Sequence, residues 1–349
     1  MSRVRLRQCC SAVCPWIPPT ATRCVFLLQE YLKTHSDDDA AGLLLAKALR
    51  NSGRGDEALR AVDGVLARKH ENIIAVVLKG SLLLDQRKPQ EAAALYQKLA
   101  ASSEARSRAE GKALGGRVAL LMGHFHDGLR DLRGAVDQAR QAKIPSLQGQ
   151  YLMTLAQAQA TLGRNQEALG TYAEVRNVEA GLDPNLMIIN VMVSQKQYDT
   201  ARSMLEDQIA HWKGKASVDF LEKLRSSLEG SIALEEGNYK DAVARLEAAL
   251  PDRASASVKS ESLGRALLET GNPGKAEAIF RRITEDPDRY TDPIGYVRGL
   301  ARLGEACEKQ GKKDEALRAY REVLSWWGAA DYSLPEIEKT KEALKRLGG

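Results

Sequence analysis

The stretch Gly304–Ala319, which reads GEACEKQGKKDEALRA, contains the pattern on which the interpretation of the whole chain rests. The pattern predicts a helix that ends at Gly311, a short polar turn, and a second helix that begins near Asp314. Small residues occupy positions 304 and 316, and an aromatic residue, Tyr320, follows four positions after the second of them. Because this combination recurs along the chain, the sequence predicts a fold of repeated helical hairpins.

Eight hairpins can be aligned by the small residue of the second helix, which we call the marker. The markers recur at intervals of 33 to 41 residues and are Ala58, Ala92, Gly128, Ala168, Ala201, Ala242, Ala276 and Ala316. Most markers have another small residue twelve positions earlier, and each has an apolar or aromatic residue four positions later, on the same helical face. We expect the two small residues to meet, so that the helices of one hairpin approach closely, and neighbouring hairpins to bury the remaining apolar surface by stacking.

The turn inside each hairpin also follows a rule. A glycine five residues before the marker is expected to end the first helix, because glycine adopts the left-handed backbone conformation at little cost. Arg87 and Lys196 stand there in the second and fifth hairpins, and the glycines of the other six are Gly53, Gly123, Gly163, Gly237, Gly271 and Gly311. The fifth hairpin departs further, with Ile189 at the small position, polar Gln208 in a core position and a strand-like apolar run at 187–193. Its spacing still predicts a helix, in the least regular part of the array.

The pattern resembles the tetratricopeptide repeat, a helix–turn–helix unit of about 34 residues. The resemblance rests on the small residues of both helices, the turn glycine, the recurrent Glu-Ala-Leu, and the aromatic residues Tyr96, Tyr172, Phe280 and Tyr320. It covers residues 39–330 as eight units. It implies an all-α fold, a right-handed α-α superhelical solenoid of helical hairpins with a C-terminal capping helix, and a concave groove lined by the first helix of each hairpin.

The start of the chain differs from the repeats. Residues 1–19 are rich in Cys, Pro and Arg and are expected to be disordered. Extending the repeat backward from the first marker places Cys24 at a marker position and Leu28 four residues beyond it. Residues 20–38 are therefore expected to form the second helix of a unit that lacks its first helix.

The end of the chain is expected to close the array. Residues 331–349 are predicted to form a capping helix, since a solenoid needs a terminal element with a solvated outer face. Ser333 and Glu336 have the spacing of a capping box at its start. Trp326 and Trp327 lie just before this helix and are expected to cover the last hairpin.

Composition excludes several classes of protein. Apolar residues make up 44% of the chain but aromatic residues only 5%, which favours packed helices over strands. Most of the net charge of +5 lies in four arginines that precede the first acid, Glu30, so the body of the chain lacks the basic stripe of a nucleic-acid binder. Neither a secretory signal nor a membrane-spanning segment is predicted. We expect a cytoplasmic protein, with a periplasmic or mitochondrial location left as alternatives.

No metal site, cofactor or catalytic centre is predicted. Cys9, Cys10, Cys14 and Cys24 form no Cys-x-x-Cys unit, so a zinc site is disfavoured and reduced thiols are expected. The run 124–127, His-Phe-His-Asp, could ligate a metal but fills the turn of the third hairpin. The run 271–275, Gly-Asn-Pro-Gly-Lys, lacks the spacing and the Ser/Thr of a phosphate-binding loop. No nucleophile–base arrangement is visible, and the protein is predicted not to be an enzyme.

The groove is the better candidate for a binding site. In tetratricopeptide repeats, certain positions of the first helix point into the concave surface, and the corresponding side chains here are polar and of both charge signs. Arginine forks among them suit carboxylates or backbone carbonyls of a bound peptide. The candidate partner-binding residues are Lys47, Arg117, Gln157, Asn190, Arg265, Arg298, Arg302 and Glu305.

The leading hypothesis is a non-catalytic scaffold that binds a peptide or protein in its concave groove. The composition, rich in Ala, Arg and Gly, favours a bacterial origin. Bacterial proteins of the family that the pattern resembles often serve envelope or secretion assemblies, so the resemblance implies a role in assembling such a complex. The alternative is the regulatory or sensor region of a larger signalling system linked to a kinase or to transcription. A kinase or DNA-binding domain upstream would favour the alternative, and a signal peptide or anchor would favour the scaffold.

Overall fold

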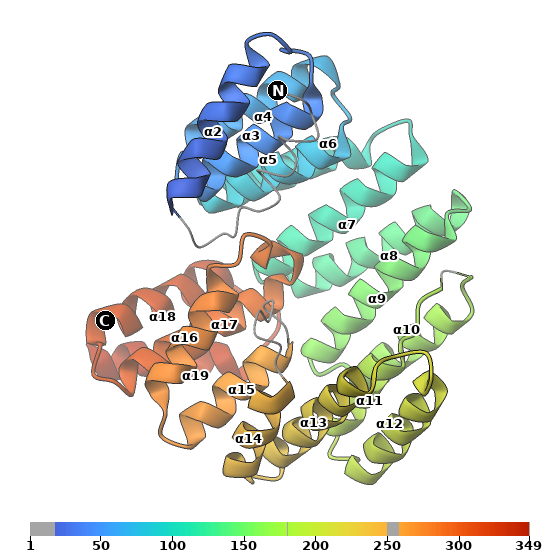
Figure 1. Cartoon of the computed structure of the whole chain (residues 1–349), viewed down its shortest axis with the longest axis vertical. Coiled ribbons are helices and arrows are strands. Elements are labelled where there is room, and N and C mark those ends of the chain that lie inside the picture. The colour runs from blue at the N-terminus through green and yellow to red at the C-terminus, as the bar shows by residue number, and fades with distance from the viewer. Residues whose placement is uncertain (1–17, 180, 250–257, 349) are drawn as a thin grey trace. The chain divides into compact units, whose positions relative to one another are not determined.

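The computed structural model describes residues 18–179, 181–249 and 258–348. These residues form eighteen α-helices, one short 3-10 helix and no strand, which confirms the all-α prediction. The chain forms two compact units, Met1–Val118 and Ala119–Gly349, which we call unit 1 and unit 2 (Figure 1). Residues 1–17 of the segment expected to be disordered lie outside the described residues.

Unit 1 begins with a single helix and continues as hairpins. A core of apolar side chains that includes Leu28, Leu49, Val62 and Leu78 joins the first four helices, α2 to α5. Cys24 lies buried in the same core, whereas Cys9, Cys10 and Cys14 lie outside the described residues. The helices are α2 (Pro18–Leu32), α3 (Asp39–Asn51), α4 (Gly55–Arg68), α5 (Ile73–Asp85), α6 (Pro89–Ala100) and α7 (Ala105–Leu121), the last of which crosses the boundary between the units.

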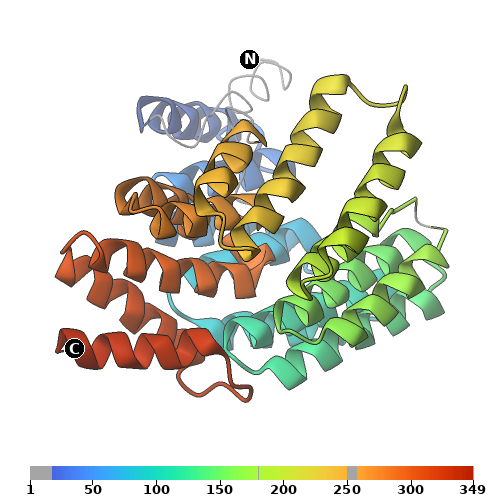
Figure 2. The same cartoon turned by 90° about the horizontal axis from the view of Figure 1, so that it is seen from below.

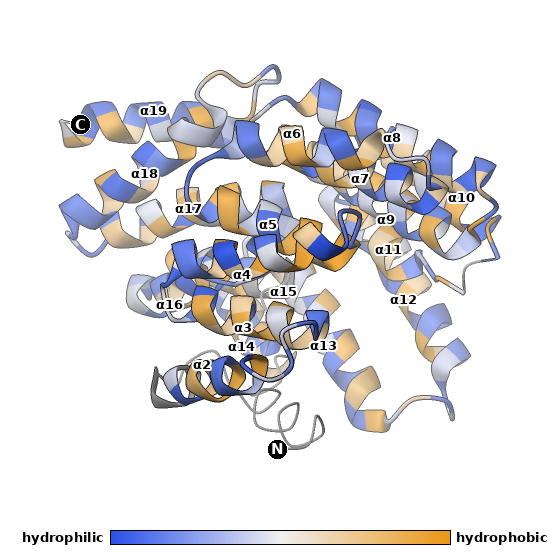
Figure 3. Cartoon of the chain, turned by 90° about the horizontal axis from the view of Figure 1, so that it is seen from above, coloured by the Kyte–Doolittle hydropathy of each residue, from blue (hydrophilic) through white to orange (hydrophobic). Residues whose placement is uncertain are grey.

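Unit 2 contains the remaining hairpins. In Figure 1 and Figure 2 its helices follow one another as antiparallel neighbours from green to red. They are α8 (Phe125–Gln141), α9 (Pro145–Thr161), α10 (Asn165–Arg176), α11 (Asn185–Ser194), α12 (Tyr198–Trp212), α13 (Val218–Glu235), α14 (Tyr239–Ala249), α15 (Val258–Glu269), α16 (Pro273–Thr284), η1 (Arg289–Thr291), α17 (Pro293–Glu308), α18 (Lys313–Trp327) and α19 (Pro335–Leu347). Hydrophobic and hydrophilic residues alternate around most of these helices, as expected for elements that bury one face (Figure 3).

The register read from the sequence is correct. Every marker is buried, and so is every residue four positions after a marker, from Val62 to Tyr320. The irregular fifth hairpin is also helical, because its apolar run lies within α11. Gln208 is buried in that hairpin and its amide is satisfied: Asn185 donates to its oxygen at 2.9 Å, and its nitrogen donates to Asp183 at 2.5 Å.

The packing inside a hairpin differs from the prediction in one respect. The small residue of the first helix does not face the marker but the side chain four residues beyond it. A Cβ atom built on Gly264 would lie 2.5 Å from the ring of Phe280, and one on Gly304 would lie 2.5 Å from the ring of Tyr320. Glycine is therefore required at these positions because an aromatic ring occupies the space of a side chain.

The turn residues behave as predicted. All six turn glycines have positive φ angles, between 72° and 81°. At Gly311 the turn is closed by hydrogen bonds from the Gly311 amide to the Glu308 carbonyl and from the Lys312 amide to the Cys307 carbonyl. Arg87 and Lys196, which replace glycine, are held at φ angles of 61° and 59°. The hairpin geometry thus imposes the left-handed conformation even on residues that disfavour it.

The C-terminal cap departs from the prediction. The capping helix α19 begins at Pro335, its N-cap is Leu334, and no side chain caps it, so the predicted capping box of Ser333 and Glu336 is wrong. Trp327 is fully buried, but it does more than cover the last hairpin. Its ring packs edge-on against Phe125, at 5.4 Å between centroids, at the start of α8.

Replacing Lys196 by glycine is expected to stabilise the protein by about 0.5–1 kcal/mol, because the strain of a lysine at positive φ is released. The matched control is the reverse change, Gly163→Lys, at a turn where no atom lies near the glycine Cβ position. That variant should lose about 1 kcal/mol or more. Chemical denaturation measures both changes, and equal stability of the two variants would contradict the assignment of these turns.

Candidate functional site

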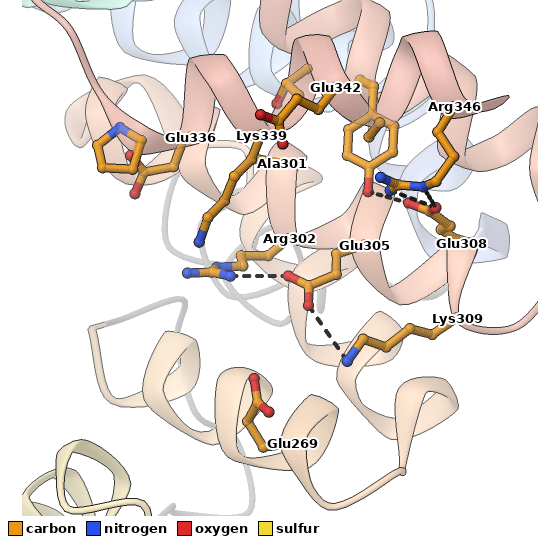
Figure 4. A pocket seen from close by; sticks show the side chains of 14 residues that line it. Glu269, Ala301, Arg302, Glu305, Glu308, Lys309, Glu336, Lys339, Glu342 and Arg346 are labelled. Carbon is orange, nitrogen blue, oxygen red and sulfur yellow. Dashed lines mark hydrogen bonds and ion pairs between the residues drawn. The ribbon is translucent and has the colours of Figure 1, made fainter. Parts of the chain in front are cut away.

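A cavity of about 540 Å³ opens between α15, α17, α18 and α19 in unit 2 (Figure 4). Its walls come mainly from the first helices of the last two hairpins and from the capping helix, with Tyr320 contributed by α18, so it lies where the predicted groove meets the cap. Most of its lining side chains are charged. They are Glu269, Ala301, Arg302, Glu305, Glu308, Lys309, Tyr320, Pro335, Glu336, Lys339, Thr340, Glu342, Ala343 and Arg346.

One wall of the cavity is tied together by ion pairs. Arg302 contacts Glu305 at 2.9 Å, and Lys309 contacts the same carboxylate at 3.6 Å. On the opposite side Arg346 of α19 donates to Glu308 of α17 at 2.7 and 2.9 Å. The Arg346–Glu308 contact links α19 to α17, and the two pairs of Glu305 lie along α17 and its C-terminal cap.

Tyr320 links this wall to the repeat packing. Its hydroxyl donates to Glu308 at 2.9 Å, and its ring covers Gly304. Burial raises the pKa of Tyr320, and the neighbouring Glu308 carboxylate raises it further, so the phenol stays protonated. The aromatic residue that defines the last hairpin therefore also orders a carboxylate of the cavity.

Three lining charges have no ion pair or side-chain hydrogen bond among the described residues, namely Lys339, Glu342 and Glu269. Figure 4 shows Lys339 extending toward the guanidinium of Arg302, with Glu269 on the far side of the cavity. The cavity therefore presents a basic region and separate carboxylates that are open to a ligand. Such an arrangement can bind a polar segment that carries both signs of charge.

The structure brings only part of the predicted groove set together at this cavity. Arg302 and Glu305 line it, and Arg298 pairs at 3.1 Å with Glu336, which also lines it. Arg265 on α15 pairs with Glu235 at 3.0 Å. Of the others, Gln157 on α9 is half-buried and Asn190 on α11 is exposed in unit 2, while in unit 1 Lys47 on α3 is exposed and Arg117 on α7 is half-buried.

Sequence reasoning missed the contribution of α19. Lys339, Glu342 and Arg346 line the cavity, although the capping helix was expected only to present a solvated face. Their spacing of three and four residues places them on one side of a helix, which is a signal that the sequence contains. What the sequence does not show is that this side faces α17.

A second cluster of ionisable groups lies beside the last two hairpins. Ligand atoms of Glu277, Cys307 and Glu315 lie within 4.8 Å of one another, a spacing that could hold a metal. Yet Arg281 and Lys312 already contact Glu277, at 2.8 and 2.6 Å, and Arg281 also pairs with Glu315. Burial raises the pKa of Cys307, which disfavours the thiolate that a metal requires. The donor set fits an internal salt-bridge network better than a metal site.

Glu277 is the centre of that network. Burial alone would raise the pKa of its carboxyl, but hydrogen bonds from Lys312, Gln310 and Arg281 outweigh burial and lower the pKa to about 2. The bonds from Lys312 and Gln310 measure 2.6 and 2.8 Å. Because Glu277 belongs to α16, Gln310 follows α17 and Lys312 precedes α18, the network joins two consecutive hairpins.

Comparison with sequence profiles of known families supports the repeat architecture. Sequence profiles described as tetratricopeptide repeat match residues 43–107, 114–184, 233–293 and 300–326. Among solved structures, the crystal structure of the P58(IPK) TPR domain is 17% identical, covers 99% of this chain and 96% of its own, and superposes with a TM-score of 0.31. Among curated proteins no significant match is found.

Within the described ranges, no helix combines the length and hydropathy needed to cross a membrane.

Glu277→Gln is expected to destabilise the protein by about 1–3 kcal/mol at neutral pH, because two cations lose their shared carboxylate. Since the folded-state pKa is depressed, this contribution is present above the ordinary carboxyl pKa and disappears as the pH falls toward 2. The stability difference between wild type and variant should therefore shrink below about pH 4.5.

The matched control is Glu285→Gln, which removes an exposed carboxylate 3.8 Å from the same arginine, Arg281. It should change stability by less than about 0.5 kcal/mol. Urea denaturation from pH 2 to 7 measures both variants, and a pH-independent difference for Glu277→Gln would contradict the proposed network.

Proposed function

Because the chain belongs to the tetratricopeptide repeat family, we propose that it is a non-catalytic scaffold that binds a protein or peptide partner on the first-helix surface of unit 2. The observation that carries this proposal is the cavity between α15, α17, α18 and α19. It is open, it is lined mainly by charged side chains, and three of its charges have no pairing within the described residues. Two residues predicted from the sequence, Arg302 and Glu305, lie in its wall.

The charge balance of the cavity favours a polypeptide over a nucleic acid. Five glutamates face four basic residues across the lining, so a polyanionic backbone would meet net repulsion. A peptide can satisfy both signs. An acidic side chain would sit between Lys339 and Arg302, and a basic side chain or backbone amide would reach Glu269 or Glu342.

In this proposal the cavity is one part of a longer binding surface. Within unit 2, Gln157, Asn190 and Arg265 extend the contact along the first helices, and Lys47 and Arg117 offer a separate contact in unit 1. The finer hypothesis is a cytoplasmic role in assembling a bacterial envelope or secretion complex. Its bacterial part is supported by composition and its assembly part by what bacterial members of the family often do, and the identity of the partner tests it.

Peptides selected from a random display library on the full-length wild-type protein provide a direct test. The double variant Arg302→Glu/Lys339→Glu should bind the selected peptides about ten- to hundredfold more weakly, because two charge-assisted contacts are lost. Fluorescence anisotropy with labelled peptides measures the dissociation constants.

The control variant Lys313→Glu/Lys345→Glu changes the net charge equally, at exposed residues of α18 and α19 outside the cavity. It should retain the wild-type affinity. Equal weakening by both double variants would show nonspecific electrostatic binding, and wild-type binding by both would place the peptide elsewhere; either result rejects the cavity as the binding site.

A further inference from the structure

The two ends of unit 2 contact each other. The loop between α18 and α19, residues 328–334, meets the turn between α7 and α8, and the hydrogen bonds between them join residues more than 200 positions apart. Each unit of a repeat array normally contacts only the neighbouring units in the stack. The contact between the two ends of unit 2 is therefore made in addition to the stacking of neighbouring hairpins.

Asp331 is the centre of the contact. Its carboxylate accepts hydrogen bonds from the backbone amides of Phe125 and His126, at 2.8 and 3.2 Å, and lies 3.2 Å from the imidazole of His126. Its own amide donates to the carbonyl of Gly123 at 3.1 Å. Phe125 and His126 are the first two residues of α8, so Asp331 satisfies amides that have no partner inside the helix.

This capping is supplied from a distant part of the chain. The local N-cap of α8, His124, makes no side-chain hydrogen bond to the helix. Side-chain caps are also missing at the starts of α4, α6, α10, α12, α16 and α18. α8 differs from these other second helices of the repeats. At its start an aspartate from the C-terminal loop provides the anionic acceptor that a helix N-terminus favours.

Packing around Asp331 requires close approach of the two backbones. A Cβ atom on Gly123 would lie 3.0 Å from the Cβ of Ala330, and Gly123 also has a φ of 79°. The indole nitrogen of Trp327 donates to the carbonyl of Leu120 at 3.3 Å. The run 124–127, which resembles a metal motif, is therefore a docking turn for the C-terminal loop.

We propose that Asp331 is a positioning residue that latches the end of unit 2 to α8 and thereby holds α19, the outer wall of the cavity, in place. The loop that carries Asp331 leads within four residues into α19, and Leu334 at the junction is buried. At the start of α19, Glu336 reaches Arg298 on α17. The use of the cavity rests on the proposed function, but the latch itself is a property of the unliganded protein.

Hydrogen exchange of the full-length protein, measured by mass spectrometry without any ligand, tests the latch. Asp331→Ala should accelerate exchange on the order of tenfold in two places, the first turn of α8 and α19, because loss of the cap opens both sides of the contact. Asp331→Asn keeps one acceptor oxygen and loses the charge, so it should give an intermediate rate at both places.

Ser217→Ala is the matched control, because it removes a cap within its own helix, where Ser217 accepts from the amide of Phe220 at 3.2 Å. It should accelerate exchange in the first turn of α13 and leave α19 unchanged. Unchanged exchange of α19 in Asp331→Ala would overturn the proposal and reduce Asp331 to a local cap. Uniform acceleration across unit 2 would overturn it as well, since Asp331 would then contribute only to global stability. Neither readout depends on whether a peptide binds the cavity.

Discussion

The structure depends on the close approach of two helices at a glycine covered by a large side chain. In the hairpins α15/α16 and α17/α18, an aromatic ring lies where a side chain of the first helix would stand. This contact sets the distance and rotation of the two helices, and with them the faces available to the next hairpin. Gly304 and Tyr320 show the consequence for the cavity, because the ring that covers the glycine also carries the hydroxyl that donates to Glu308.

The last two hairpins are joined by charge as well as by apolar packing. Glu277 collects donors from the hairpin that follows it, and Arg281 of the same helix reaches Glu315. Such a network leaves no buried carboxylate without a counter-charge, which keeps its desolvation from destabilising the fold. Together with the contact of Asp331 at the start of α8, it gives the cavity walls support on more than one side.

Local features of the fold could be predicted from the sequence, and long-range ones could not. The markers, the turn glycines and the helical nature of the run 187–193 were predicted correctly because each depends on residues close in sequence. The capping box at Ser333 was wrong, and in the stretch before it Asp331 contacts α8 while Trp327 contacts both α7 and α8. No periodicity marks that contact, since it joins segments from opposite ends of unit 2. Arg302 and Glu305 could be predicted as groove residues because they occupy repeat positions on a first helix. Lys339 could not, because it lies on α19, which is not part of the repeat pattern.

A double-mutant cycle at Gly264 and Phe280 tests the hairpin contact most directly. In an exposed helix Gly→Ala stabilises by about 0.5–1 kcal/mol, and Gly170→Ala on α10, where no atom is near, should show this gain. Gly264→Ala should instead destabilise the protein by about 1–3 kcal/mol, and Phe280→Leu should relieve much of that loss, so that the two changes are coupled by about 1 kcal/mol or more. A stabilising Gly264→Ala, or strict additivity with Phe280→Leu, would contradict the claim that a glycine beneath a ring determines how these hairpins pack.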